Sequence, residues 1–222
     1  MQFISYLING ISLGSVYAII ALGYTMVYGI AKMLNFAHGD IIMVGSYVVY
    51  IAVSSLGLNP ILSVVISAIV CLVLGVVIEK VAYKPLRHAS KLAVLITAIG
   101  VSYFLQNMAL LIFGANTKSF TSVVPAVSVK LGGITITAET IVTIVACIVI
   151  MICLTLFINK TKAGHAMQAV SEDQDAAQLM GINVNATISL TFAIGSALAA
   201  VAGVLLCSAY PSLTPYTGAM PG

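Results

Sequence analysis

Long uncharged apolar runs, separated by short polar segments, make up most of the chain. Residues 6–30 form the first run, and about 25 residues at 1.5 Å per residue are enough to cross a hydrocarbon core roughly 30 Å thick. Comparable runs begin at Ile41 and then cover residues 61–78, 92–113, 141–158 and 188–210. This pattern predicts an all-α fold, a polytopic transmembrane helical bundle of about six membrane segments, with residues 1–222 forming a single domain.

The composition agrees with a membrane protein. Only 7% of the 222 residues are charged and 61% are hydrophobic, whereas a soluble domain has about 25% charged residues. The mean hydropathy is +1.14. A net charge of +3, spread along the chain, does not indicate a nucleic-acid partner.

Cysteine and histidine residues add no catalytic or metal site. The four cysteines lie within apolar runs, without a CxxC spacing or a histidine neighbour, so we interpret them as packing residues. His38, His88 and His165 lack the arrangement of Ser or Cys with an acid that is typical of a nucleophile and its base. The sequence therefore predicts no catalytic residue and no metal ligand.

Clustered basic residues indicate how the chain is oriented. Residues 79–91 hold four of the nine basic residues, and Lys160 and Lys162 end a later apolar run. Membrane proteins carry an excess of Lys and Arg in cytoplasmic loops. Both clusters are therefore expected on the cytoplasmic side.

Small residues at four-residue spacing predict close helix packing in two runs, because they let helix backbones approach each other in lipid. They are Gly10, Gly14 and Ala18 in the first run and Gly195, Ala199 and Gly203 in the last.

A polar break separates the first two runs. Asn35, His38 and Asp40 fall within six residues, and Gly39 supplies backbone freedom, so we expect the helix to stop and restart with Asp40 as N-cap. One interpretation is a discontinuous helix whose N-terminus helps form a translocation path. The alternative is a capped turn near the lipid headgroups, with Lys32 snorkelling beside it.

Two neighbouring amides lie inside the run of residues 92–113. Gln106 and Asn107 are costly to leave unpaired in hydrocarbon, so they are expected to face other helices or a wet cavity. Bonding between helices and contact with a polar substrate both remain open.

An external β-hairpin is predicted between two later runs. Residues 127–131 and 134–137 alternate apolar and polar positions around Gly132-Gly133, the pattern of two strands joined by a tight turn. On the outer side it would either receive a soluble partner or close a loop.

Residues 160–185 form the longest polar segment, with Glu172 and Asp173 near its middle. Ser171 and Gln174 fit a capping box, and Gly181 suits a left-handed C-cap, so the pattern predicts a helix over about residues 172–180. Its apolar side would lie on the membrane interface or dock a partner protein.

Several motifs resemble one family of transport proteins. They are GYTMVYGI at residues 23–30, LNFAHGD at 34–40, YKPLR at 83–87, IGVSYFLQN at 99–107 and DAAQLMGI at 175–182. Together they are similar to the branched-chain amino-acid (leucine, isoleucine, valine) permease subunits of ATP-binding cassette (ABC) importers. The likeness covers nearly the whole chain, and the Asn-Phe-Ala-His-Gly-Asp block is its most specific part.

The resemblance implies two functional regions. Residues 160–187 would be the cytoplasmic coupling loop that engages the ATPases, through Glu172, Asp173, Ala176, Ala177, Leu179 and Gly181. The candidate translocation path would include Asn35, His38, Gly39, Asp40, Gln106 and Asn107.

The same resemblance implies partners and a location. These are two ABC ATPase subunits that bind the ATP, a second permease subunit, a periplasmic or extracellular solute-binding protein and a prokaryotic plasma (inner) membrane. This chain itself would bind no cofactor. Because family members continue through several more membrane segments, we expect this chain to be truncated at its C-terminus.

Three alternatives remain open. Relatives in the same family carry urea or short amides, which would change the substrate but not the mechanism. A proton-coupled secondary carrier would instead use Asp40 and His38 to bind or relay protons. A structural membrane scaffold would have no use for the coupling loop.

Overall fold

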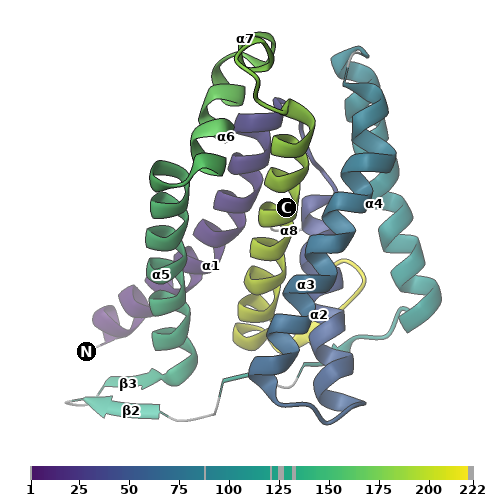
Figure 1. Cartoon of the computed structure of the whole chain (residues 1–222). Helices are drawn as coiled ribbons and strands as arrows, with labels where there is room; N and C mark the ends of the chain where they lie inside the picture. Colours follow the sequence, from purple (N-terminus) through teal and green to yellow (C-terminus); the bar gives the residue numbers. More distant parts are fainter. Residues whose placement is uncertain (1, 88, 121, 125–127, 132–133, 220–222) are drawn as a thin grey trace.

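The computed structural model describes residues 2–87, 89–120, 122–124, 128–131 and 134–219 (Figure 1). The elements in chain order are α1 Gln2–Ala31, α2 His38–Ser54, α3 Pro60–Ile78, the π-helical turn η1 Glu79–Tyr83, the 3₁₀ turn η2 Lys84–Leu86, α4 Lys91–Phe113, β1 Lys118–Ser119, β2 Ser128–Leu131, β3 Ile134–Thr137, α5 Ala138–Lys160, α6 Lys162–Glu172, α7 Gln174–Leu179, α8 Val184–Ala209 and β4 Ser212–Leu213.

Among the described residues, five helices are long and apolar enough to cross a membrane: α1, α3 with its two following turns, α4, α5 and α8. The sixth apolar helix, α2, has 17 residues and is therefore about 25 Å long, shorter than a hydrocarbon core of roughly 30 Å. The predicted all-α polytopic bundle of about six segments is confirmed.

Helix α8 forms the centre of the bundle, with α1 and α5 on one side and α2 and α3 on the other (Figure 1). A Cβ atom built at Gly75 of α3 would lie 2.0 Å from Ser196 Oγ of α8. One built at Gly203 of α8 would lie 2.5 Å from the backbone oxygen of Ile42 in α2. Only glycine permits these approaches. A Cβ atom built at Gly195 would lie 2.8 Å from Val27 Cγ2 of α1, and Ala199 is fully buried, so the close packing predicted for Gly195, Ala199 and Gly203 is confirmed.

The outer half of α1 packs differently from the prediction. Gly10 and Gly14 have no atom of the described residues within 4 Å of an added Cβ. In Figure 1 this half of α1 runs away from α8, so no described helix uses the small-residue face. The prediction of close packing is therefore wrong for Gly10 and Gly14 among the described residues, whereas Ala18 packs against the buried core.

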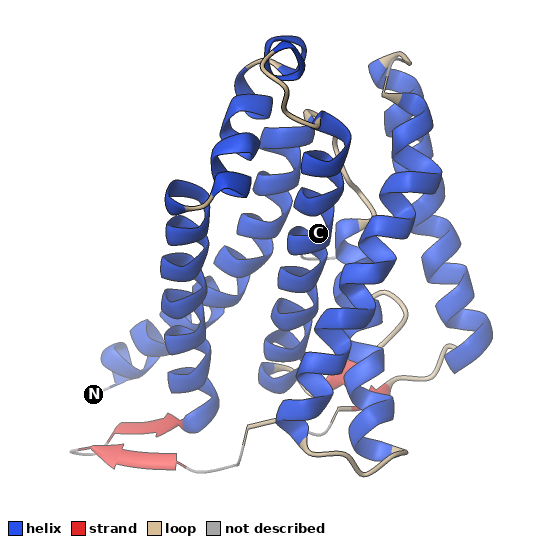
Figure 2. Cartoon of the chain, in the orientation of Figure 1, coloured by secondary structure: helices blue, strands red, loops and turns tan. Residues whose placement is uncertain are grey.

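The strands lie at the end of the bundle opposite α7 (Figure 2). Strands β2 and β3 pair antiparallel, with Ser128 opposite Thr137 and Leu131 opposite Ile134, which confirms the hairpin. Its Gly132-Gly133 turn and residue 127 lie outside the described residues. A second antiparallel pair, β1 with β4, ties the segment after α4 to the segment after α8.

Basic residues gather at the end that carries α6 and α7. Of the nine Lys and Arg residues, all except Lys118 on β1 and Lys130 on β2 lie in segments at this end. This distribution supports the expectation that this end faces the cytoplasm.

Candidate functional site

The polar segment folds as two short helices instead of the single helix predicted over residues 172–180. Ser171 lies inside α6, where its Oγ donates to the backbone oxygen of Gln168 at 2.7 Å, so it is not an N-cap. The cap is Asp173, whose extended backbone separates the helices and whose Oδ1 accepts from the amides of Asp175 and Ala176 at 2.9 and 3.0 Å. The capping box is therefore wrong: the carboxylate two positions later caps instead.

Gly181 closes α7 as predicted. Its φ is +83°, in the left-handed region that favours glycine. Its amide donates to the backbone oxygen of Gln178 at 3.0 Å, and the amide of Ile182 donates to that of Ala177 at 3.0 Å. The chain thus turns sharply from α7 into α8.

The C-terminal end of α7 exposes large apolar side chains beside the exposed polar residues Asp175 and Gln178. Leu179 is 89% exposed and Met180 is 84% exposed, and α7 lies at one end of the molecule in Figure 1. Glu172, Asp173 and Ala176 are also exposed. Large apolar side chains this exposed in a polar segment are typical of a docking surface.

Ala177 faces inward instead. It is 4% exposed and belongs to the buried core. A six-residue helix lying on the bundle turns one face inward, and a small side chain fits there, so any role of Ala177 in coupling would be exercised through the packing of α7 and stays a prediction. Ala177 seats α7 on the rest of the protein.

A polar cavity of about 690 Å³ lies beside α7. Its lining combines residues of α7 and the α7–α8 connection with Arg87 of the segment after η2. The cavity therefore lies between α7 with its connection to α8 and the basic segment of residues 79–91.

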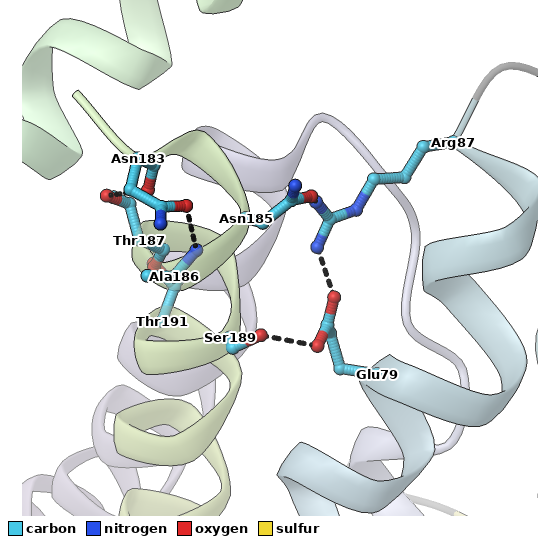
Figure 3. Close-up of polar contacts among 8 residues, drawn as sticks. All are labelled: Glu79, Arg87, Asn183, Asn185, Ala186, Thr187, Ser189 and Thr191. Carbon is cyan, nitrogen blue, oxygen red and sulfur yellow. Dashed lines mark hydrogen bonds and ion pairs between the residues drawn. The ribbon is translucent and has the colours of Figure 1, made fainter. Parts of the chain in front are cut away.

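A buried ion pair lies within that basic segment, and hydrogen bonds of its two members connect it to α8 (Figure 3). The Arg87 guanidinium pairs with Glu79 Oε1 and also donates to Asn185 Oδ1 in the first turn of α8. The second carboxylate oxygen of Glu79 accepts from Ser189 Oγ at 2.6 Å. Glu79 is completely buried and Arg87 is 9% exposed.

Sequence reasoning missed this network. Arg87 was expected to set orientation, with contact to a partner or to lipid phosphates as the alternative, and no partner within the chain was predicted. Glu79 ends a long apolar run eight positions before Arg87, and an acid in that place needs a cationic partner. That spacing was the available signal, while Asn185 and Ser189 could not be found without the fold.

The break between α1 and α2 lies inside the protein. Lys32 leaves α1 with a φ of +56°, and α2 begins about half-way along the bundle in Figure 1. Asn35, His38 and Asp40 are 2%, 1% and 2% exposed. A discontinuous helix fits this burial better than a turn near the headgroups.

Asp40 is the third residue of α2 and not its N-cap. That place belongs to Ala37, which offers no side-chain hydrogen bond. Asp40 reaches α4 instead: Gln106 Nε2 donates to its Oδ1 at 2.9 Å and to Ser102 Oγ at 3.2 Å. The predicted cap is wrong because the carboxylate finds a donor on a neighbouring helix.

The other residues predicted for the translocation path, Asn35, His38 and Asn107, lie in different surroundings. The Tyr83 hydroxyl donates to Asn35 Oδ1 at 2.9 Å, which anchors the break on η1. The His38 ring faces Tyr24 of α1 edge-on, with centroids 6.0 Å apart. Asn107 is exposed and donates to the backbone oxygen of Tyr103 in its own helix at 2.7 Å.

Gly39, Asp40 and Gln106 share a cavity of about 310 Å³. Its lining consists of Phe36, Gly39 and Asp40 from the start of α2, Ile99, Ser102, Tyr103 and Gln106 from α4, and Gly218 and Ala219 from the turn after β4. This is the one cavity that holds both predicted α2 and α4 path residues among those found in the described structure.

A bundle of apolar spanning helices, a short helix that starts inside it around a polar cavity, and an exposed apolar helix at one end define a polytopic membrane permease. The chain belongs to the family described as "Branched-chain amino acid transport system / permease component", whose sequence profile matches residues 6–221. It is a multi-pass protein of the plasma membrane.

Individual proteins that are similar to the chain carry names that agree with this family. The high-affinity branched-chain amino acid transport system permease protein BraD of Pseudomonas aeruginosa is 42% identical over 233 residues, covering 100% of this chain and 76% of BraD. LivH of Escherichia coli is 40% identical over 235 residues, with the same coverage, 100% and 76%. A probable LivH of Methanocaldococcus jannaschii is 31% identical over 202 residues, covering 85% of this chain and 61% of that protein. None of the solved structures matches the chain.

Proposed function

We propose that this chain is a membrane-spanning permease subunit of an ABC importer that carries branched-chain amino acids inward across the plasma (inner) membrane. The observation that supports this best is the 42% identity to BraD over the whole chain. The exposed Leu179 and Met180 at the cytoplasmic end agree with it, since an importer needs a surface for its ATPases.

The proposed partners are two ATPase subunits, a second permease subunit and a solute-binding protein outside the membrane. ATP would be bound and hydrolysed by the ATPases, and this chain would act as a transport subunit without a cofactor or a catalytic residue. ATP binding can drive transport only if it favours one conformation of the permease over another. This requires contacts between the ATPases and the permease that differ between the two conformations.

The coupling segment suits this transfer of motion. α7 is short, seated by Ala177, and followed by the sharp turn at Gly181 into the central helix α8. The ion pair of Glu79 with Arg87 extends the connection to the end of α3 through Asn185 and Ser189. A displacement of α7 by the ATPases would therefore be transmitted to both α8 and α3.

The experiment is uptake of radioactive leucine into proteoliposomes that contain the full transporter, with binding protein outside and ATP inside. Uptake is expected only with ATP, and not with the non-hydrolysable analogue. Uptake that follows a proton gradient and needs no ATPase would overturn the proposal. Radioactive urea and acetamide, tested in parallel, distinguish the related substrates.

A further inference from the structure

The cavity between α2 and α4 is lined by both polar and apolar residues. Asp40, Gln106 and Ser102 supply the polar groups, while Phe36, Ile99 and Tyr103 supply apolar surface. Its volume of about 310 Å³ lies at the small end of the range for ligand sites, roughly 300–1,000 Å³. A small molecule with one polar end and one aliphatic end fits this distribution.

Asp40 is the group in this cavity that most needs a ligand. Its side chain is 2% exposed, and Oδ2 has no hydrogen-bond partner among the described residues. Oδ1 already accepts from Gln106, so one oxygen is fixed and the other is free. A buried carboxylate with a free oxygen is stabilised most by a cation that also donates hydrogen bonds.

Gln106 orients the carboxylate of Asp40 through a hydrogen bond. Its Nε2 bridges Asp40 Oδ1 and Ser102 Oγ, at 2.9 and 3.2 Å, which fixes the orientation of both amide and acid. Gly39 lines the same cavity and belongs to the first turn of α2, where amide groups lack an acceptor within the helix. The helix start therefore offers donors close to the acceptor.

We infer that Asp40 binds the α-ammonium group of the transported amino acid in this cavity, with Gln106 positioning the carboxylate. The apolar walls then receive the aliphatic side chain, and the start of α2 is available to the amino acid's own carboxylate. This inference rests on the proposed function and selects amino acids over urea and short amides, which carry no ammonium group.

The inference is tested by competition for binding to the assembled transporter, without binding protein. The probe is radioactive leucine, and the competitors are unlabelled leucine and 4-methylpentanoate, which has the same aliphatic chain and carboxylate but no ammonium. With the wild-type protein, 4-methylpentanoate is expected to compete about 30-fold less well than leucine, as for loss of a buried charge contact. With Asp40→Asn, the two competitors are expected to become nearly equal, because leucine alone loses affinity.

Asp40→Asn keeps the shape of the side chain and an acceptor for Gln106, and a melting temperature within the wild-type range checks its fold. Asn107→Ala is the matched control, because Asn107 is the exposed neighbour of Gln106 on α4; its competition ratio is expected to equal the wild type. An unchanged ratio in Asp40→Asn would overturn the inference. If the wild-type transporter takes up no leucine with ATP, the proposed function itself fails, so the two failures are distinguishable.

Discussion

The ion pair of Glu79 with Arg87 is shielded from water on nearly all sides. Both carboxylate oxygens are used, one by Arg87 and the other by Ser189. In such a pair the attraction mainly offsets the loss of hydration, so its presence alone says little about stability. Removing one partner, however, leaves a buried charge without compensation.

Arg87→Ala is therefore expected to lower the free energy of unfolding by about 3–5 kcal/mol, measured by chemical denaturation in detergent. Replacing both partners, with Glu79→Leu and Arg87→Met, is expected to recover most of this loss. Lys84→Ala is the control, since Lys84 is exposed in the same basic segment; its effect is expected within about 0.5 kcal/mol. Equal effects of the Arg87 and Lys84 substitutions would contradict a structural role for the pair.

The sequence was enough to identify which residues are polar groups within the apolar runs, but it was not enough to identify their hydrogen-bond partners. The sequence identified Asp40 and Gln106 as polar groups within apolar runs, but these residues are 66 positions apart and their hydrogen bond depends on which helices are neighbours. Hydropathy carries no such information. The same limit explains the wrong N-cap, because a donor on α4 holds the Asp40 side chain.

At the scale of elements, α7 presents two apolar side chains to solvent. Leu179 and Met180 are the most exposed large hydrophobic residues of the described chain. They contribute almost nothing to the packing of this chain alone. Their position is explained if another protein covers them.

The double substitution Leu179→Ser with Met180→Ser is expected to weaken ATPase association by about tenfold or more, since buried apolar anchors dominate interfaces. The melting temperature of the permease alone is expected to stay unchanged. Co-purification with tagged ATPase measures the association. Leu111→Ser with Ile112→Ser is the control, because this exposed pair lies near the far end of α4. Equal ATPase recovery from both double variants would exclude α7 as the docking element.

Gly181→Val tests the geometry of α7 separately from its surface. A β-branched residue at a φ of +83° costs of order 1–3 kcal/mol of backbone strain. The turn into α8 is expected to open, which lowers ATPase association while membrane insertion remains normal. Ala177→Asp is expected to have the same two effects, because it places a carboxylate on the buried face of α7. Retention of full ATPase binding by both variants would show that the packing of α7 on the bundle is not required for ATPase association.

Elements were predictable where their signal is local. The apolar runs and the alternating hairpin each depend on neighbouring residues, and the structure has both. The division of the polar segment into α6 and α7 was not predictable, because Ser171 and Asp173 are both acceptable caps and only the extended backbone at Asp173 decides between them. The pairing of β1 with β4 was also missed, since it joins segments almost a hundred positions apart.

At the scale of the whole molecule, the segment after α8 returns into the bundle and meets the start of α2. A Cβ atom built at Gly218 would lie 1.6 Å from the backbone oxygen of Gly39, so two backbones touch at residues that line the α2–α4 cavity. Hydrogen bonds within residues 214–219 hold this turn in shape, and β4 ties its beginning to β1. The start of α2 and the turn after β4 thus line the candidate substrate site together.

Gly218→Ala is expected to push this turn away from α2, because the added methyl group cannot fit beside Gly39. Overpacking of this kind costs about 1–3 kcal/mol. Gly100→Ala is the matched control on α4, where an added Cβ meets nothing within 4 Å. The measurement is maleimide labelling of Ser102→Cys in a Cys153→Ala background, since Ser102 lines the cavity and Cys153 is the exposed native thiol. The rate of labelling at Ser102→Cys is expected to increase with Gly218→Ala and to stay unchanged with Gly100→Ala. Equal labelling rates in the two variants would mean that the turn does not close the cavity.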